Sequence, residues 1–284
     1  MELEQKQLEK IVQILEYFID KKTLEERYNV KIPNLQNLPD CCESLSDLDQ
    51  KKGCDANVEL KEKLSKILSG QEQGQETKEK IADWIISDWG GISKLKDGTD
   101  RAKKVSEILK NSSDEKALED DVNKLNLSDR IPTISKVLSF ISPEKYAICD
   151  SRVIFSLNWL LFLSETDNLI KFSELSTRNN IIKSYSLKFL LEKLSLKPET
   201  ELKQYSDYLD AIRKITAELH RSPKKTSSKD KDWKLYDTEM LLFSLAADLE
   251  YGLPFLIREL ILNNASKHSI NEKLKEILTS KNAL

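Results

Sequence analysis

The chain has 284 residues, of which 39% are hydrophobic and 33% charged, and its formal net charge is −3. This composition excludes a disordered chain, and the acidic balance disfavours a protein that coats nucleic acid through a uniformly basic surface. The sequence contains no glycine-rich phosphate loop, no repeated Cys-x-x-Cys spacing and only two histidines, so we expect no cofactor, no metal and no histidine-based catalysis.

The first ten residues, MELEQKQLEK, carry charges from the second position onward. A signal peptide needs an apolar core in this region, and a membrane-spanning helix needs about 20 consecutive apolar residues. Neither pattern is present, so we expect an intracellular protein without a membrane partner.

Apolar residues recur at helical spacing along most of the chain, and no pair of alternating strands suggests a hairpin, which predicts an all-α fold. A loop-rich segment is expected over 28–55. The predicted helices cover residues 3–20, 57–69, 77–88, 100–110, 115–125, 132–141, 150–163, 178–195, 199–220, 236–250, 253–263 and 269–279. We expect an N-terminal helical part (1–125), a central unit (126–220) and a C-terminal part (221–284) that packs back on the first.

The most apolar part of the chain, residues 131–163, contains two charges of opposite sign, Lys136 and Asp150. Pro132 suits the first turn of a helix, so Lys136 is expected near that helix start, where the helix dipole and apolar surroundings favour a neutral, nucleophilic amine. Asp150 is expected to cap the following helix. A lysine and an aspartate in this arrangement suit chemistry at a sugar anomeric carbon, with the amine forming a Schiff base and the carboxylate stabilising positive charge.

A plainer interpretation of the same residues stays open. Asp150 followed by Arg152 also fits a helix cap with a local ion pair, and Lys136 also fits a side chain that extends its amine to the surface.

The segment 132–153, PTISKVLSFISPEKYAICDSRV, resembles the helix–hairpin–helix DNA glycosylase superfamily, and within it the bacterial branch similar to 8-oxoguanine glycosylases. The matching elements are Ser135-Lys136 and Asp150-Ser151-Arg152-Val153. The sequence departs from the family in two ways: its IPTIS turn lacks the usual glycines, and the interval from lysine to aspartate is shorter than usual.

The resemblance implies a two-lobed helical fold and a DNA N-glycosylase, with or without AP lyase activity, in which Lys136 is the nucleophile and Asp150 activates it. The implied partner is double-stranded DNA containing a modified base, bound by a monomer in the bacterial cytoplasm at the nucleoid. The implied roles are DNA repair or defence against phage. The excised base, an oxidised purine or a bulky modified pyrimidine, is left open.

Further candidate residues follow from what base flipping requires. An extruded base needs aromatic stacking and polar contacts. Phe140 lies one turn after Lys136, Trp89 precedes two glycines that permit close approach, and Glu239 is an isolated acid in an apolar helix. The candidate DNA contacts are Thr133 and Ser135 near the helix start, Arg152, and Lys224 and Lys225 in the basic stretch 221–234.

Two other functions remain open at this point. A noncatalytic DNA-binding or protein-interaction module derived from the same fold would fit the acidic composition and the glycine-free turn. A helical regulator that binds a small ligand in a tryptophan-lined cleft would fit the aromatic residues.

Overall fold

The computed structural model describes residues 3–21, 23–92, 99–164, 169–193, 197–221 and 232–262, and they are mostly helical. The elements are α1 (Gln5–Lys21), α2 (Leu24–Arg27), the 3-10 helices η1 (Leu35–Asn37) and η2 (Asp40–Leu48), α3 (Cys54–Ser69), α4 (Gln75–Trp84), the π-helix η3 (Ile85–Trp89), α5 (Asp100–Lys110), α6 (Glu115–Val122), α7 (Ile131–Ile141), α8 (Ser151–Leu163), β1 (Ile170–Phe172), α9 (Asn180–Ser184), α10 (Leu187–Lys193), β2 (Thr200–Leu202), α11 (Tyr205–Arg221) and α12 (Leu235–Leu262).

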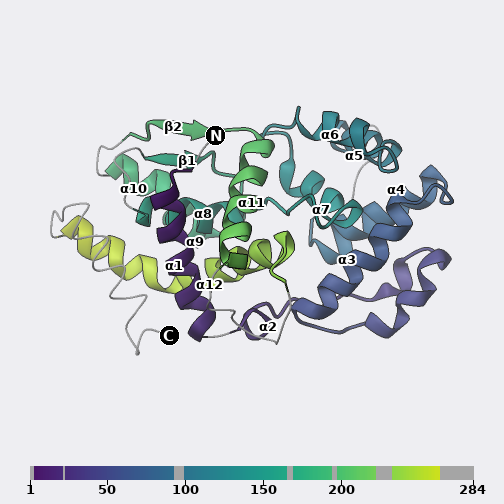
Figure 1. The fold of residues 1–284 in the computed structure, drawn as a ribbon, viewed down its shortest axis with the longest axis horizontal. Helices are drawn as coiled ribbons and strands as arrows, with labels where there is room; N and C mark the ends of the chain where they lie inside the picture. Colours follow the sequence, from purple (N-terminus) through teal and green to yellow (C-terminus); the bar gives the residue numbers. More distant parts are fainter. Residues whose placement is uncertain are drawn as a thin grey trace.

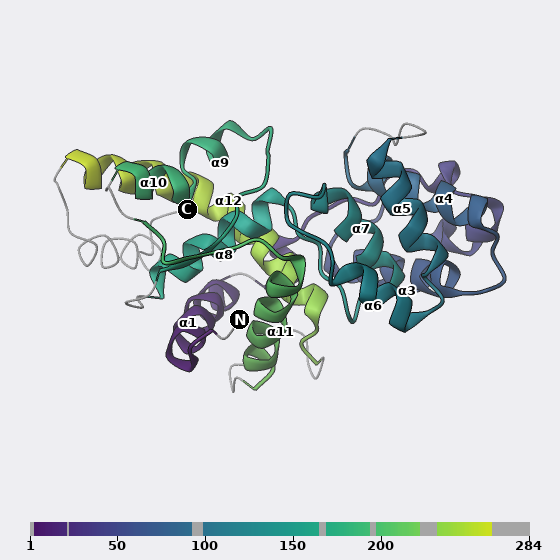
Figure 2. The same ribbon diagram turned by 90° about the horizontal axis from the view of Figure 1, so that it is seen from above.

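The helices form two groups, which Figures 1 and 2 show at opposite ends of an elongated molecule. In one group α3 and α5 pack on α7, and α4 packs on α5 and η3. In the other group α8 packs on α12 and β1, and α1 packs on α8 and α11. The short helix α2 contacts both α3 and α12, so it lies where the two groups meet.

Helices α7 and α8 are the buried centres of the two groups, one in each. Every residue of α7 except Pro132 is buried, as is every residue of α8 from Val153 onward. Burying one large aliphatic side chain stabilises a fold by about 1.5–3 kcal/mol, so these two apolar segments are the natural centres around which the other helices pack. The sequence prediction of two buried helices in this region is therefore confirmed.

Other parts of the secondary structure differ from the prediction. A short parallel sheet pairs β1 with β2, with Ile170 opposite Thr200, and β2 occupies the expected start of the helix at 199–220. The helix predicted over 178–195 is divided into α9 and α10. The two helices predicted over 236–250 and 253–263 are one, since α12 continues through Pro254. The helix predicted over 269–279 lies outside the described residues.

The packing crosses the expected domain boundary near residue 125 in both directions. Helix α1 packs with α8 and α11, which belong to the expected central unit, whereas α7 packs with α3 and α5 of the N-terminal part. The three boundaries therefore stay predictions. Within the described residues, no helix combines the length and the apolarity needed to cross a membrane.

Candidate active site

A pocket of about 320 Å³ lies between the two groups of helices. One wall comes from η3 and α7, and the other comes from the start of α8, the segment before α9, and α12. The predicted site residues that line it are Trp89, Lys136, Asp150, Arg152 and Glu239. The fold thus brings together residues that are up to 150 positions apart in the sequence.

The Lys136 amine and the Asp150 carboxylate face each other in this pocket. Lys136 is 7% exposed, and its Nζ atom lies 3.8 Å from Asp150 Oδ2. Asp150 Oδ1 accepts hydrogen bonds from the backbone N–H groups of Arg152 (3.0 Å) and Val153 (3.1 Å), which confirms that Asp150 caps α8. One carboxylate oxygen therefore fixes the helix start while the other is directed to the amine.

Lys136 does not occupy the helix start that the sequence suggested. Helix α7 begins at Ile131, so Lys136 lies in its second turn, beyond the first turn where the helix dipole acts. The electrostatic partner of this amine is therefore Asp150 rather than the end of its own helix.

A serine holds the beginnings of α7 and α8 together. The Ser135 hydroxyl accepts the Cys149 N–H (2.9 Å) and approaches the Cys149 carbonyl (3.5 Å), and Ser135 is fully buried. Thr133 is also buried, at 4% exposure. Both hydroxyls were expected to contact DNA, but their burial makes them interior packing groups, so neither is included in a DNA interface below.

Trp89 forms the aromatic wall beside the lysine. Its ring centroid lies 5.9 Å from Lys136 Nζ, and its indole N–H donates to Asn57 Oδ1 at 2.9 Å. Phe140 was expected in the base pocket, but it is fully buried and meets the Trp89 ring edge to face at 5.0 Å, so it supports Trp89 from behind. A Cβ atom on Gly90 would lie 2.8 Å from Lys136 Cδ and from the carbonyl oxygens of Ile85 and Ile86, so a larger residue here would require both the lysine and the backbone to move.

Glu239 forms a buried ion pair with Lys61. Lys61 Nζ donates to Glu239 Oε2 at 3.0 Å, and the two side chains are 1% and 2% exposed. The same ammonium lies 5.9 Å from the ring centroids of both Trp89 and Phe140. Burial raises the pKa of the Glu239 carboxyl, and the neighbouring Lys61 ammonium opposes that rise.

This pair gives a stability prediction. Glu239→Gln should lower the free energy of unfolding by about 3–5 kcal/mol, because it leaves the Lys61 ammonium buried without a counter-charge. The double variant Lys61→Met/Glu239→Gln should recover most of that loss. Urea denaturation at neutral pH measures the free energy of unfolding of both variants. Glu76→Gln, in the exposed Glu76–Lys80 pair, is the control, and its free energy of unfolding should change little. A Glu239→Gln protein as stable as wild type would contradict the prediction.

Arg152 and Arg178 are exposed and line the mouth of the pocket. The Arg152 guanidinium lies 4.9 Å from the centroid of the Phe243 ring, which orients it beside the entrance. Lys224 and Lys225, the other predicted cationic contacts, lie outside the described residues.

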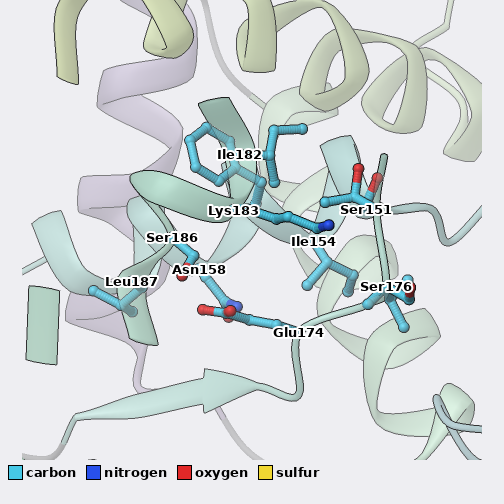
Figure 3. A pocket seen from close by; sticks show the side chains of 12 residues that line it. Ser151, Ile154, Asn158, Glu174, Ser176, Ile182, Lys183, Ser186 and Leu187 are labelled. Atoms are coloured by element: carbon cyan, nitrogen blue, oxygen red, sulfur yellow. The ribbon is translucent and has the colours of Figure 1, made fainter. Parts of the chain in front are cut away.

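A second pocket, of about 120 Å³, is shown in Figure 3, and it shares lining residues with the first. The residues that line both are Ser151, Thr177 and Ile182. In the smaller pocket Lys183 extends toward Ser151, while Asn158 donates to the Phe172 carbonyl and accepts its N–H. The Asn158 contacts hold β1 on α8, so its role is structural.

One group of potential metal ligands occurs among the described residues. The ligand atoms of Glu25, Cys54 and Asp55 lie within 4.8 Å of one another. Glu25 already accepts the Asp55 N–H at 3.1 Å, and the Cys54 thiol lies 3.4 Å from Met240 Sδ. These contacts cap α3 and pack it on α12, and we assign no metal to the group.

Two residues at the site were missed from the sequence: Tyr28, which lines the pocket, and Lys61, which does not line it but pairs with Glu239. Lys61 shares one helix face with Leu64 and Leu68, and a lysine on an apolar stripe was a usable signal of a buried charge. Tyr28 follows α2 in a segment that was read only as a loop, and no sequence pattern connects it with the pocket. Comparison with known proteins gives no further guidance, since no family model, curated protein or solved structure matches this chain.

Proposed function

We propose that this protein is a DNA glycosylase that excises a modified base through a Schiff base on Lys136. The observation that carries the proposal is the buried Lys136 amine, 3.8 Å from a carboxylate oxygen of Asp150 inside a pocket between two groups of helices. That arrangement suits the two-lobed helix–hairpin–helix fold that the sequence motif resembles, with one group of helices as each lobe.

The proposed chemistry uses the two side chains in order. Asp150 takes a proton from the Lys136 ammonium, and the freed amine attacks C1′ of the flipped nucleotide. The glycosidic electron pair leaves with the base, which takes the proton that Asp150 accepted from the ammonium, and the restored Asp150 carboxylate stabilises the positive charge that develops on the sugar. Loss of one of the two N–H protons and opening of the sugar ring, whose oxygen takes a proton, give a protonated Schiff base between Nζ and C1′.

The same Schiff base would also give the protein AP lyase activity, which is cleavage of the DNA strand at the abasic site. It acidifies the proton at C2′, and removal of that proton expels the 3′ phosphate by β-elimination, which cleaves the strand. Water then hydrolyses the Schiff base and restores the lysine. Borohydride reduces the same intermediate to a stable amine, which makes it detectable as a covalent protein–DNA adduct.

The pocket mouth supports DNA as the partner through its two exposed arginines. Replacing Arg152 by glutamine should weaken binding to undamaged duplex DNA and lower the slope of log affinity against log salt concentration by about 0.9, the value for one lost phosphate contact. Fluorescence anisotropy at several salt concentrations measures this slope. Arg213→Gln, an exposed arginine on α11 that does not line the pocket, should leave it unchanged. An unchanged slope for Arg152→Gln would remove this residue from the interface.

The test of the proposal is formation of abasic sites in DNA that carries modified bases. Purified protein is incubated with oligonucleotides and genomic DNAs of different base modification, with borohydride trapping on a pre-formed abasic duplex in parallel. We expect abasic sites in at least one DNA and a trapped adduct on the abasic duplex. Salt-sensitive DNA binding without either product would instead support a noncatalytic module of the same fold.

A further inference from the structure

Two polar oxygen atoms in the pocket have no hydrogen-bond partner among the residues that the structure describes. Glu239 uses Oε2 to bind Lys61, and within the described part of the chain its Oε1 has no hydrogen bond. Tyr28 lines the same pocket at 3% exposure, and its hydroxyl likewise has no hydrogen bond among the described residues. Among the described residues, neither oxygen is one of the fully buried side-chain atoms that lack a hydrogen-bond partner, so each keeps some exposure, and both side chains line the pocket.

Each of these two groups has a defined hydrogen-bonding character. Burial and the nearby Glu239 carboxylate raise the pKa of Tyr28 well above its usual value, so its hydroxyl keeps its proton and can donate. Glu239 receives a proton donor from Lys61 on one oxygen, which leaves the other as an acceptor. An acceptor and a donor therefore stand unpaired in the pocket that contains Lys136.

We propose that Glu239 and Tyr28 read the flipped base, and that the base carries an exocyclic amino group. This inference rests on the proposed glycosylase function and names its substrate class: modified cytosine, adenine or guanine rather than modified uracil or thymine.

Two features of the pocket fit this role. An amino group donates to Glu239 Oε1, and the ring nitrogen or carbonyl next to it accepts from the Tyr28 hydroxyl. A base with a carbonyl in place of the amino group would place its carbonyl oxygen against Glu239 Oε1. Two hydrogen-bond acceptors would then face each other in a desolvated site, which weakens the binding of that base. The volume of about 320 Å³ is within the size range of small-ligand pockets, about 300–1,000 Å³, and Trp89 offers a face for stacking.

The first experiment compares substrates that differ only in this group. The first pair of duplexes contains 5-hydroxymethylcytosine or 5-hydroxymethyluracil, and the second pair contains 8-oxoadenine or 8-oxohypoxanthine. Single-turnover excision is measured for each duplex. We expect the amino member of at least one pair to be excised at least about tenfold faster, the discrimination that one well-formed pair of base contacts provides. Trapping on abasic DNA without an amino preference in either pair would overturn the inference.

The second experiment separates base reading from the lysine chemistry. Tyr28→Phe should slow excision of the preferred base about tenfold. The variant should be trapped on a pre-formed abasic duplex as efficiently as wild type, because that duplex has no base to read. Tyr146→Phe, which removes a buried hydroxyl outside this pocket, is the matched control and should affect neither reaction. Equal excision by Tyr28→Phe and wild type would contradict the inference.

Glu239 needs a variant that preserves the fold. Because Glu239→Gln leaves Lys61 unpaired, Lys61→Met/Glu239→Gln is used instead, and we expect it to lose most of its preference for the amino base while it still traps abasic DNA. A retained preference would remove Glu239 from base reading. Failure of the wild-type protein to trap abasic DNA is a different result, because it would overturn the proposed glycosylase function itself.

Discussion

Replacing Lys136 by glutamine is expected to abolish base excision and borohydride trapping, with a fall in the excision rate of at least about 1,000-fold, as seen when a covalent nucleophile is removed. Glutamine has a similar length but no amine that can form a Schiff base. The capping hydrogen bonds from Arg152 and Val153 to Asp150 do not depend on Lys136, so the fold should be retained. Single-turnover excision and adduct formation on denaturing gels measure the two losses.

Lys78→Gln is the matched control for this variant. Lys78 is also a buried lysine, at 5% exposure, but its Nζ donates to the Ser112 hydroxyl at 3.0 Å and does not line the pocket. Its replacement should leave trapping intact. An adduct that persists in Lys136→Gln would show that another amine is the nucleophile and would refute the assignment.

Replacing Asp150 by asparagine is expected to slow excision by about 100- to 10,000-fold, the range for loss of a positioned proton-transfer group. Asparagine can still cap α8, so stability should change little. It cannot take the ammonium proton from Lys136 or stabilise positive charge on the sugar. We therefore expect DNA affinity close to that of wild type together with much slower chemistry, measured by anisotropy and by single-turnover kinetics on the same duplex.

A second capping aspartate controls for effects of the cap itself. Asp114 caps α6 by accepting the Ala117 N–H at 3.0 Å, and it does not line the pocket. Asp114→Asn should leave excision unchanged. If Asp150→Asn were as active as Asp114→Asn, Asp150 would have only a structural role.

The local features of the site were predictable from sequence because they depend on neighbouring residues. Asp150 caps a helix through N–H groups two and three positions later, and the apolar stretch around Lys136 fixes which helices are buried. Helix α7 begins at Ile131, one residue before the predicted start, so the boundary was predicted closely, and the error was to assign the field of the helix start to Lys136, which lies in the second turn.

That these residues come together in one pocket could not be predicted, because it depends on contacts between elements that are distant in sequence. Trp89 and Glu239 were chosen one by one from their local context, and only the packing of η3, α7 and α12 places them in one pocket. The parallel strands β1 and β2 are three residues long and about 30 positions apart, too short for an alternating pattern. Tyr28 was missed for the same reason, since the position of α2 between α3 and α12 determines where it lies.

The most direct test of the central claim is to map the covalent adduct. Wild-type protein is trapped with borohydride on abasic DNA, the DNA is digested, and mass spectrometry identifies the modified residue. We predict that the reduced adduct is on Lys136. An adduct on Lys61, which lies near the same tryptophan but is paired with Glu239, or on any other amine would contradict Lys136 as the nucleophile.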